Sequence, residues 1–284
     1  MIFGQIFRHI QKRQNLTSQG KPLYKSSFSP FSNAKNAPPI ILYTASTPNG
    51  HKASITLEEL GLDYEVKALD FSKNEQKEPW FLQINPNGRI PALVDRSNHN
   101  FAVFESGAMM LYLVEKYDRE HRMSFPHGSD LYWQMVAWLF FQNAGVGPMQ
   151  GQANHFYRYA PEMIEYGISR YQNETRRLYS VLENRLKENG NWLVGDKLTI
   201  ADIANYGWVN MAFWAGVEIK EFQRLDDWCE RISAREAVKR GLDVPTPFEK
   251  KKKYYENKEA AEAEFRKGSS WILKGQEEDA KKKY

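Results

Sequence analysis

Cysteine is nearly absent from this chain of 284 residues, in which Cys229 is the only one. A single cysteine excludes an intrachain disulfide and any metal site built from several thiolates. A reducing compartment is therefore the simplest expectation. Cys229 lies in a segment of mixed apolar and polar residues, and we expect it to be a buried structural thiol. The six histidines have no metal-ligand spacing, so the sequence predicts no metal.

Long apolar runs are also missing, because the longest stretches, such as residues 136–141, fall far short of the about 18 residues that a membrane-spanning helix needs. We therefore expect no membrane insertion.

The net charge of +4 is unevenly distributed: residues 1–39 hold six basic residues and no acid, whereas the remainder carries 33 basic and 35 acidic residues. A nearly neutral body lacks the concentrated basic surface that nucleic acid requires, so nucleic acid is not an expected partner.

The acid-free segment 1–39 reads as a basic leader that precedes the folded protein. Apolar residues recur there at helical spacing beside Arg8, Lys12 and Arg13, namely Ile2, Phe3, Ile6, Phe7 and Ile10. This composition is typical of a mitochondrial transit peptide, and a disordered cytosolic extension is the alternative. The expected location is accordingly cytoplasmic or mitochondrial.

Residues 40–122 have the pattern of a small α/β domain. An apolar strand at 40–43, a Thr-Pro-Asn-Gly turn at 47–50, a helix at 53–60 that stops at Gly61 and a strand at 64–69 make a parallel βαβ unit. The second half of the domain follows a turn at Asn85-Pro-Asn-Gly88. It is predicted to contain strands at 90–94 and 101–104 and a helix at 106–116.

Residues 130–249 have helical patterns only. The predicted helices span residues 131–143, 161–189, 200–215, 224–233 and 235–241. Thr199 stands three residues before Asp202, which is a capping box with Asp in place of Glu and marks a helix start. Residues 250–284 form a charged tail, for which we expect a solvated helix or disorder.

Several short motifs, in this order along residues 40–245, together resemble the cytosolic glutathione transferases. They are Ile90-Pro-Ala-Leu93, Phe104-Glu-Ser-Gly107 and Leu198-Thr-Ile-Ala-Asp202. Three more resemble the fungal Ure2p-like and bacterial nu-class branch: Thr47-Pro-Asn-Gly-His-Lys52, Gly145-Val-Gly-Pro-Met-Gln-Gly151 and Tyr166-Gly-Ile-Ser-Arg-Tyr171. The resemblance implies a thioredoxin-like domain packed on a C-terminal helical bundle, with glutathione as cosubstrate, and a homodimer.

Residues 89–91 correspond to the segment that pairs with glutathione in this family, which implies a binding role for Arg89 and Ile90. Pro91 matches the family's cis-proline, and a cis bond would turn the backbone of Ile90 toward the cysteinyl backbone of glutathione. The alternative is an ordinary proline in an edge strand. Glu105 and Ser106 correspond to the site of the γ-glutamyl carboxylate, since the start of a helix favours an anion. A plain helix cap is the alternative there.

The resemblance places Thr47 and Asn49 beside the glutathione sulfur. Hydroxyl and amide donors near a helix start can stabilise a thiolate and lower the thiol pKa, which implies catalytic roles for both residues. A helix cap made by Asn49 is the competing interpretation. Gln76 and Arg170 match a glutamine and an arginine that bind glutathione, with solvated surface positions as the alternative.

The second substrate, a small electrophile or a disulfide, would occupy an apolar pocket near the glutathione sulfur. Candidate pocket residues are aromatic, although aromatics at helical spacing are more often core: Trp138, Phe140, Phe141, Phe156 and Tyr157. His155 is expected to pack rather than to bind a ligand. The implied activity is glutathione transfer or glutathione-dependent disulfide reduction. The alternative is a non-catalytic module with the same fold that regulates or binds a protein partner.

Overall fold

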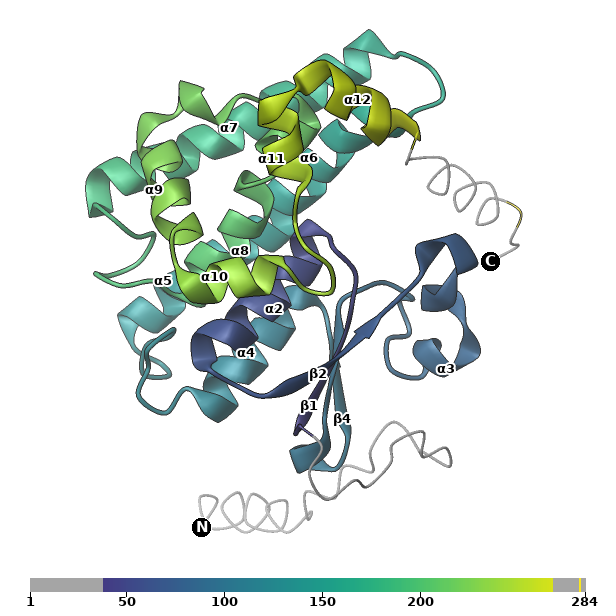
Figure 1. The fold of residues 1–284 in the computed structure, drawn as a ribbon. Helices are drawn as coiled ribbons and strands as arrows, with labels where there is room; N and C mark the ends of the chain where they lie inside the picture. Colours follow the sequence, from purple (N-terminus) through teal and green to yellow (C-terminus); the bar gives the residue numbers. More distant parts are fainter. Residues whose placement is uncertain (1–37, 268–280, 282–284) are drawn as a thin grey trace, which may run out of the picture. The chain divides into compact units, whose positions relative to one another are not determined.

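The computed structural model describes residues 38–267 and residue 281. The leader therefore lies outside the described residues except for its last two positions, as does most of the chain after residue 267. Within the described part, a domain with a mixed sheet and helices comes first, and a helical domain follows it (Figure 1). This is the predicted fold class, a thioredoxin-like domain followed by a helical bundle, and it is confirmed.

The sheet has the strand order β2-β1-β3-β4. Strand β1 pairs in parallel with β2 and antiparallel with β3, so that Leu42 lies opposite Val66 on one side and Leu93 on the other. Strand β4 pairs antiparallel with β3 at the edge. The strand bounds are Ile40–Thr44 (β1), Tyr64–Ala68 (β2), Ala92–Asp95 (β3) and Phe101–Phe104 (β4). The predicted parallel βαβ unit is thus present.

Two helices of the first domain pack against each other and against the sheet. These are α2 (Pro48–Leu60) and α4 (Ser106–Tyr117), and the short α3 (Pro79–Leu82) lies apart from them in Figure 1. Helix α2 begins at the Thr-Pro-Asn-Gly turn, five residues earlier than predicted, because Thr47 caps it and proline suits the first helical position. Gly61 ends it with a φ of 68°.

The helical domain packs on α2 through α8 and α10. Its helices are α5 (Asp130–Phe141), α6 (Gly147–Asn154), α7 (Glu165–Asn189), α8 (Ile200–Val209), α9 (Gln223–Ser233) and α10 (Glu236–Leu242). The predicted capping box is present at the start of α8, where the Asp202 carboxylate accepts from the backbone N–H of Thr199 at 3.0 Å. Asp202 is fully buried, so this cap also anchors the core.

Two predicted helices differ from the observed ones, and one observed helix was not predicted. The predicted helix 161–189 begins only at Glu165, because Ile164 has the extended backbone angles φ −107° and ψ 90°. The predicted helix 200–215 is divided near Asn210, and a 3₁₀ turn at Ala212–Ala215 follows. Helix α6 was not among the predicted helices, since its glycines and polar residues lack an apolar stripe.

The described part of the tail forms two helices, α11 (Lys250–Glu256) and α12 (Lys258–Lys267). The helical expectation is right, but these helices are not wholly solvated. Tyr254 and Ala261 are each 3% exposed, and Arg158 forms a bidentate ion pair with Glu262. The tail therefore contributes apolar contacts to the helical domain.

Candidate functional site

A polar cavity of about 530 Å³ opens where the first domain meets the helical domain. The first domain contributes five lining residues, Asn49, Lys52, Arg89, Glu105 and Ser106. The helical domain contributes polar and aromatic lining residues, Gln142, Asn143, Gln152, His155, Tyr159 and Trp208. Four of the predicted site residues, Asn49, Arg89, Glu105 and Ser106, thus meet in one cavity.

Asn49 and Thr47 have different places at the start of α2. Thr47 is the N-cap, since its Oγ1 accepts from the backbone N–H of Gly50 at 3.1 Å. The alternative interpretation, in which Asn49 caps this helix, is therefore wrong. The Oδ1 of Asn49 instead accepts from the indole Nε1 of Trp208 at 2.9 Å. This bond occupies the acceptor end of the amide and leaves the Nδ2 end as a donor at the cavity wall.

The N-terminus of α4 forms another part of the wall. Ser106, the first residue of the helix, is 6% exposed and lines the cavity. Glu105 precedes it with φ 68° and ψ 114°, a left-handed backbone that non-glycine residues rarely adopt. Such conformations concentrate at ligand sites. The unsatisfied N–H groups of the first helical turn and the positive end of the helix favour an anion here.

The segment from Arg89 to Pro91 approaches the same region. The peptide bond between Ile90 and Pro91 is cis, as the family resemblance implies. Arg89 lines the cavity, and its backbone carbonyl accepts from the Nδ2 of the buried Asn85 at 2.6 Å. Ile90 and Pro91 themselves are not among the cavity-lining residues.

Gln76 and Arg170 are not brought to the cavity wall. The Nε2 of Gln76 donates to the Oδ1 of Asn74 at 2.8 Å, and its buried Oε1 has no hydrogen-bond partner among the described residues. Arg170 is exposed on α7, with its guanidinium 5.9 Å from the centroid of the Tyr171 ring. Their predicted binding roles remain predictions.

The aromatic side chains of the cavity are not those that the sequence suggested. None of the five candidates lines it: Trp138, Phe140, Phe141, Phe156 and Tyr157. Trp208, Tyr159 and His155 line it instead. Helical spacing alone could not distinguish these residues from core aromatics, because the choice depends on how α6 and α8 pack.

Two π-helical turns flank α6, and both contribute cavity residues. The first, Gln142–Val146, provides Gln142 and Asn143, and the second, His155–Tyr159, provides His155 and Tyr159. A π turn inserts one residue into a helix and rotates the side chains that follow. The sequence pattern does not predict this rotation. It therefore did not predict that these polar residues line the cavity.

Lys52 is the most unusual residue that sequence reasoning missed, although it ends the Thr-Pro-Asn-Gly-His-Lys motif. It lines the cavity but is only 1% exposed. Its Nζ donates to the Oε1 of Gln142 and, at 3.0 Å, to the Oδ1 of Asn143. Burial lowers the pKa of Lys52 to about 7, and the negative charge of Glu105 opposes that shift.

Cys229 lies away from these residues in α9 and is 1% exposed. Burial raises the pKa of its thiol to about 11, so the group stays protonated near neutral pH. Across residues 38–267, no cluster of three or more His, Cys, Asp or Glu side chains could hold a metal ion. No helix in the described part of the chain is long and apolar enough to cross a membrane.

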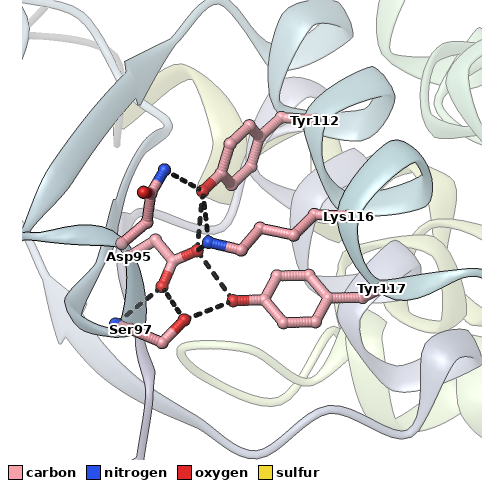
Figure 2. Close-up of polar contacts among 6 residues, drawn as sticks. Asp95, Ser97, Tyr112, Lys116 and Tyr117 are labelled. Atoms are coloured by element: carbon pink, nitrogen blue, oxygen red, sulfur yellow. Dashed lines mark hydrogen bonds and ion pairs between the residues drawn. The ribbon is translucent and has the colours of Figure 1, made fainter.

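A second polar cluster lies at the opposite end of α4 (Figure 2). There the buried carboxylate of Asp95 accepts from the hydroxyls of Tyr112 at 2.6 Å, Tyr117 at 2.7 Å and Ser97 at 2.7 Å. The Nζ of Lys116 lies 2.9 Å from the same carboxylate. Burial alone would raise the pKa of Asp95, but these hydrogen bonds outweigh it and lower the pKa below the usual range.

A thioredoxin-like sheet is followed by a helical domain, a cis-proline precedes β3, and an anion-favouring helix start faces a polar cavity. These features define the fold class of the glutathione transferases. Comparison with known families agrees. The glutathione S-transferase N-terminal domain matches residues 38–115, and the glutathione S-transferase C-terminal domain matches residues 168–236. The chain belongs to the glutathione S-transferase superfamily.

Individual relatives place it in the Ure2p-like branch. The chain is 44% identical to the disulfide-bond oxidoreductase YfcG of Escherichia coli over 72% of this chain and 94% of YfcG. It is 38% identical to the transcriptional regulator URE2 of Saccharomyces cerevisiae over 69% of this chain and 65% of URE2. A glutathione transferase homologue of Lodderomyces elongisporus, solved with two glutathione molecules per subunit, is 45% identical with a TM-score of 0.71. That match covers 73% of this chain and 99% of the homologue.

Proposed function

We propose that this protein is a glutathione-dependent enzyme that transfers glutathione to small electrophiles, reduces disulfides with glutathione, or does both. The observation that carries the proposal is the single cavity in which the amide of Asn49 and the start of α4 face the same space. Solved relatives hold glutathione, among them the Lodderomyces elongisporus homologue. The relative named a disulfide-bond oxidoreductase supports the second reaction.

The start of α4 binds the γ-glutamyl carboxylate in this proposal. Ser106 adds a hydroxyl donor to the backbone N–H groups of the first helical turn. The carboxylate of Glu105 suits the α-amino group at the same end of glutathione, because opposite charges attract at short range. The backbone of Ile90 pairs with the cysteinyl part, as an added strand would.

The sulfur lies near the start of α2, where Asn49 donates to the developing thiolate. Trp208 holds the carbonyl end of this amide, so the NH₂ end is oriented without a further conformational cost. Thr47 uses a lone pair to cap the helix, and its hydroxyl proton is still available to donate. Such donors stabilise the thiolate and lower the pKa of the glutathione thiol.

The reacting sulfur comes from glutathione, because the thiol of Cys229 is buried and protonated at neutral pH. In disulfide reduction, the thiolate of one glutathione attacks a substrate sulfur, forms a mixed disulfide and releases one substrate thiol. A second glutathione thiolate then attacks the glutathione sulfur of that mixed disulfide. This step releases the other substrate thiol and oxidised glutathione, so both electrons come from the two glutathiones.

A non-catalytic module that binds a protein partner is the second candidate, and the similarity to a transcriptional regulator favours it. A purely regulatory protein would not need an oriented amide at the sulfur position. Assays of the purified protein with a chlorinated aromatic electrophile and with a small mixed disulfide, both with glutathione, decide the question. Turnover of either substrate supports the enzyme, and turnover of neither favours the module.

We further propose that the protein works as a homodimer. Large apolar side chains remain exposed on β4 and α5, where Phe101 is 51%, Trp133 is 57% and Phe140 is 58% exposed. Light scattering of the purified protein tests this proposal, and a monomer mass would reject it.

The proposed location is mitochondrial, on the composition of residues 1–39, with a cytoplasmic enzyme as the alternative. Fusing these residues to a fluorescent protein tests it, together with sequencing of the native N-terminus. Mitochondrial signal and removal of about the first 36 residues are expected for a transit peptide. A diffuse cytosolic signal and an uncut N-terminus would reject the mitochondrial location.

A further inference from the structure

Lys52 is a buried cation on the wall of the cavity, and the roles proposed above leave it without a function. The exposed fraction of its side chain is 1%, yet it borders the cavity. Burying an ammonium without a counter-charge costs several kcal/mol, so lysine is rarely found in such a place. An anionic ligand that pairs with this charge would account for the buried position of Lys52.

Two glycines on neighbouring helices leave space for the Lys52 side chain and for its partner Asn143. A Cβ on Gly207 of α8 would lie 2.9 Å from the Cγ of Lys52 and 2.8 Å from the carbonyl oxygen of Pro48. A Cβ on Gly107 of α4 would lie 2.3 Å from the Nδ2 of Asn143. Only the absence of a side chain at these two glycines allows Lys52 and its partner Asn143 to occupy their places.

The hydrogen bonds of Lys52 leave part of its donor capacity for a ligand. An ammonium has three N–H groups, and two of them face the amide oxygens of Gln142 and Asn143. Both partners are neutral. Across residues 38–267, Lys52 forms no ion pair with a carboxylate, although Glu105 acts on it electrostatically. The protonated form therefore lacks a counter-charge in direct contact.

We infer that Lys52 is a further binding residue, whose ammonium pairs with the α-carboxylate of the γ-glutamyl end of the ligand and takes up a proton from solvent when the ligand binds. The inference rests on the proposed glutathione site. The start of α4 and Lys52 then hold the carboxylate, while Glu105 holds the α-amino group. Together they recognise the two charges of one amino-acid zwitterion.

Proton uptake follows from the electrostatics of the empty cavity. With a pKa of about 7, Lys52 is partly neutral at pH 7.5, and a carboxylate in contact would restore its proton. The other charged or titratable groups on the cavity wall are Glu105 on α4, Arg89 before β3, and His155 and Tyr159 on the second π turn. Of these, histidine has the usual pKa nearest to 7, so His155 is the group to control for.

Calorimetric titration of the full-length protein with S-hexylglutathione tests the inference, because this thioether has no thiol to ionise. At pH 7.5, binding enthalpies in phosphate and in Tris buffer give the number of protons exchanged. The wild-type protein is expected to take up about three quarters of a proton, the neutral fraction at pH 7.5 of a lysine whose pKa is about 7. Lys52→Met should abolish this uptake and weaken binding at pH 6.5 about tenfold, with a smaller difference at pH 8.5.

His155→Gln and Lys73→Met are the matched controls, since Lys73 is an exposed lysine outside the cavity, and both should keep the uptake. A second measurement needs no variant: in protein labelled at the lysine Cε, one resonance should titrate near pH 7 and move to higher pH with ligand. Binding without proton uptake, or unchanged uptake in Lys52→Met, overturns the inference alone. Absence of any binding overturns the proposed glutathione site as well.

Discussion

The two ends of α4 carry polar clusters of opposite character. At its C-terminal end, four side chains satisfy the carboxylate of Asp95 from several directions (Figure 2). At its N-terminal end, Ser106 and the first helical turn face a cavity, and the nearby ammonium of Lys52 has only neutral partners. A buried cluster whose polar groups are all paired with one another stabilises a fold. A cluster that keeps hydrogen-bond donors at a cavity wall can instead bind a ligand. Burial or polarity alone does not separate the two.

The closed cluster should carry the largest stability effect. Asp95→Ala removes a buried acceptor and leaves several donors unsatisfied, so the free energy of unfolding should fall by about 3 kcal/mol. Urea denaturation measures this change. The glutathione affinity of the folded fraction should stay at the wild-type value. A loss of affinity would contradict the assignment of stability to the C-terminal end of α4 and of binding to its N-terminal end.

The same cluster sets a pH dependence of stability. Hydrogen bonds hold the folded-state pKa of Asp95 below the unfolded value of about 3.9. Its stabilising contribution is therefore complete well above pH 4 and is lost as the pH falls toward the folded-state pKa. Asp95→Asn should flatten the loss of stability below pH 4 relative to wild type, as followed by denaturation at a series of pH values. If the wild-type protein and Asp95→Asn lose stability identically below pH 4, other groups control this loss.

At the open end, Asn49→Ala should lower kcat/KM ten- to hundredfold, or about 1.4–2.7 kcal/mol, because a donor to the developing thiolate is lost. Its effect on the free energy of unfolding should be small. Trp208→Phe is a matched control, since it removes only the bond that orients the Asn49 amide and should reduce activity less. Wild-type activity in folded Asn49→Ala would remove this residue from the mechanism.

Ser106→Ala should weaken glutathione binding by about 1–2 kcal/mol, the usual contribution of a hydrogen bond to a charged group. Calorimetric titration provides the measurement. Ser97→Ala, at the closed end, removes a comparable hydroxyl from the Asp95 carboxylate and should leave glutathione affinity unchanged. Equal affinity losses in both variants would contradict the assignment of binding to one end only.

The smallest expected effect is that of Tyr117→Phe. This change removes one of several hydrogen bonds to Asp95 and should cost about 1 kcal/mol of unfolding free energy. Thermal denaturation detects such a change. A loss as large as that of Asp95→Ala would mean that the cluster acts through this tyrosine rather than through the carboxylate.

Features coded by neighbouring residues were predictable from the sequence. Gly61 marks the end of α2, and the pair Thr199 and Asp202 marks the start of α8. Both depend on backbone chemistry within a few positions, whereas the cis bond before Pro91 was implied by the resemblance to a known family. The four-stranded sheet followed from such local signals together with the resemblance to a known family.

The composition of the cavity was less predictable because it depends on packing between distant segments. Lys52 meets Gln142 and Asn143 across about 90 residues of chain, and only the glycines of α4 and α8 and a π turn make this meeting possible. Helical periodicity describes one helix at a time. It therefore could not show that Trp208, rather than Trp138, would face Asn49.

The ionisation of bound glutathione tests the central claim most directly, namely that the open end of the site binds glutathione and activates its sulfur. The ultraviolet absorbance of the thiolate, followed against pH with saturating protein, gives the pKa of the bound thiol. We predict a pKa at least one unit below that of the free thiol in the wild-type protein, and a return toward the free value in Asn49→Ala. A bound thiol that titrates as it does in free solution would contradict the account.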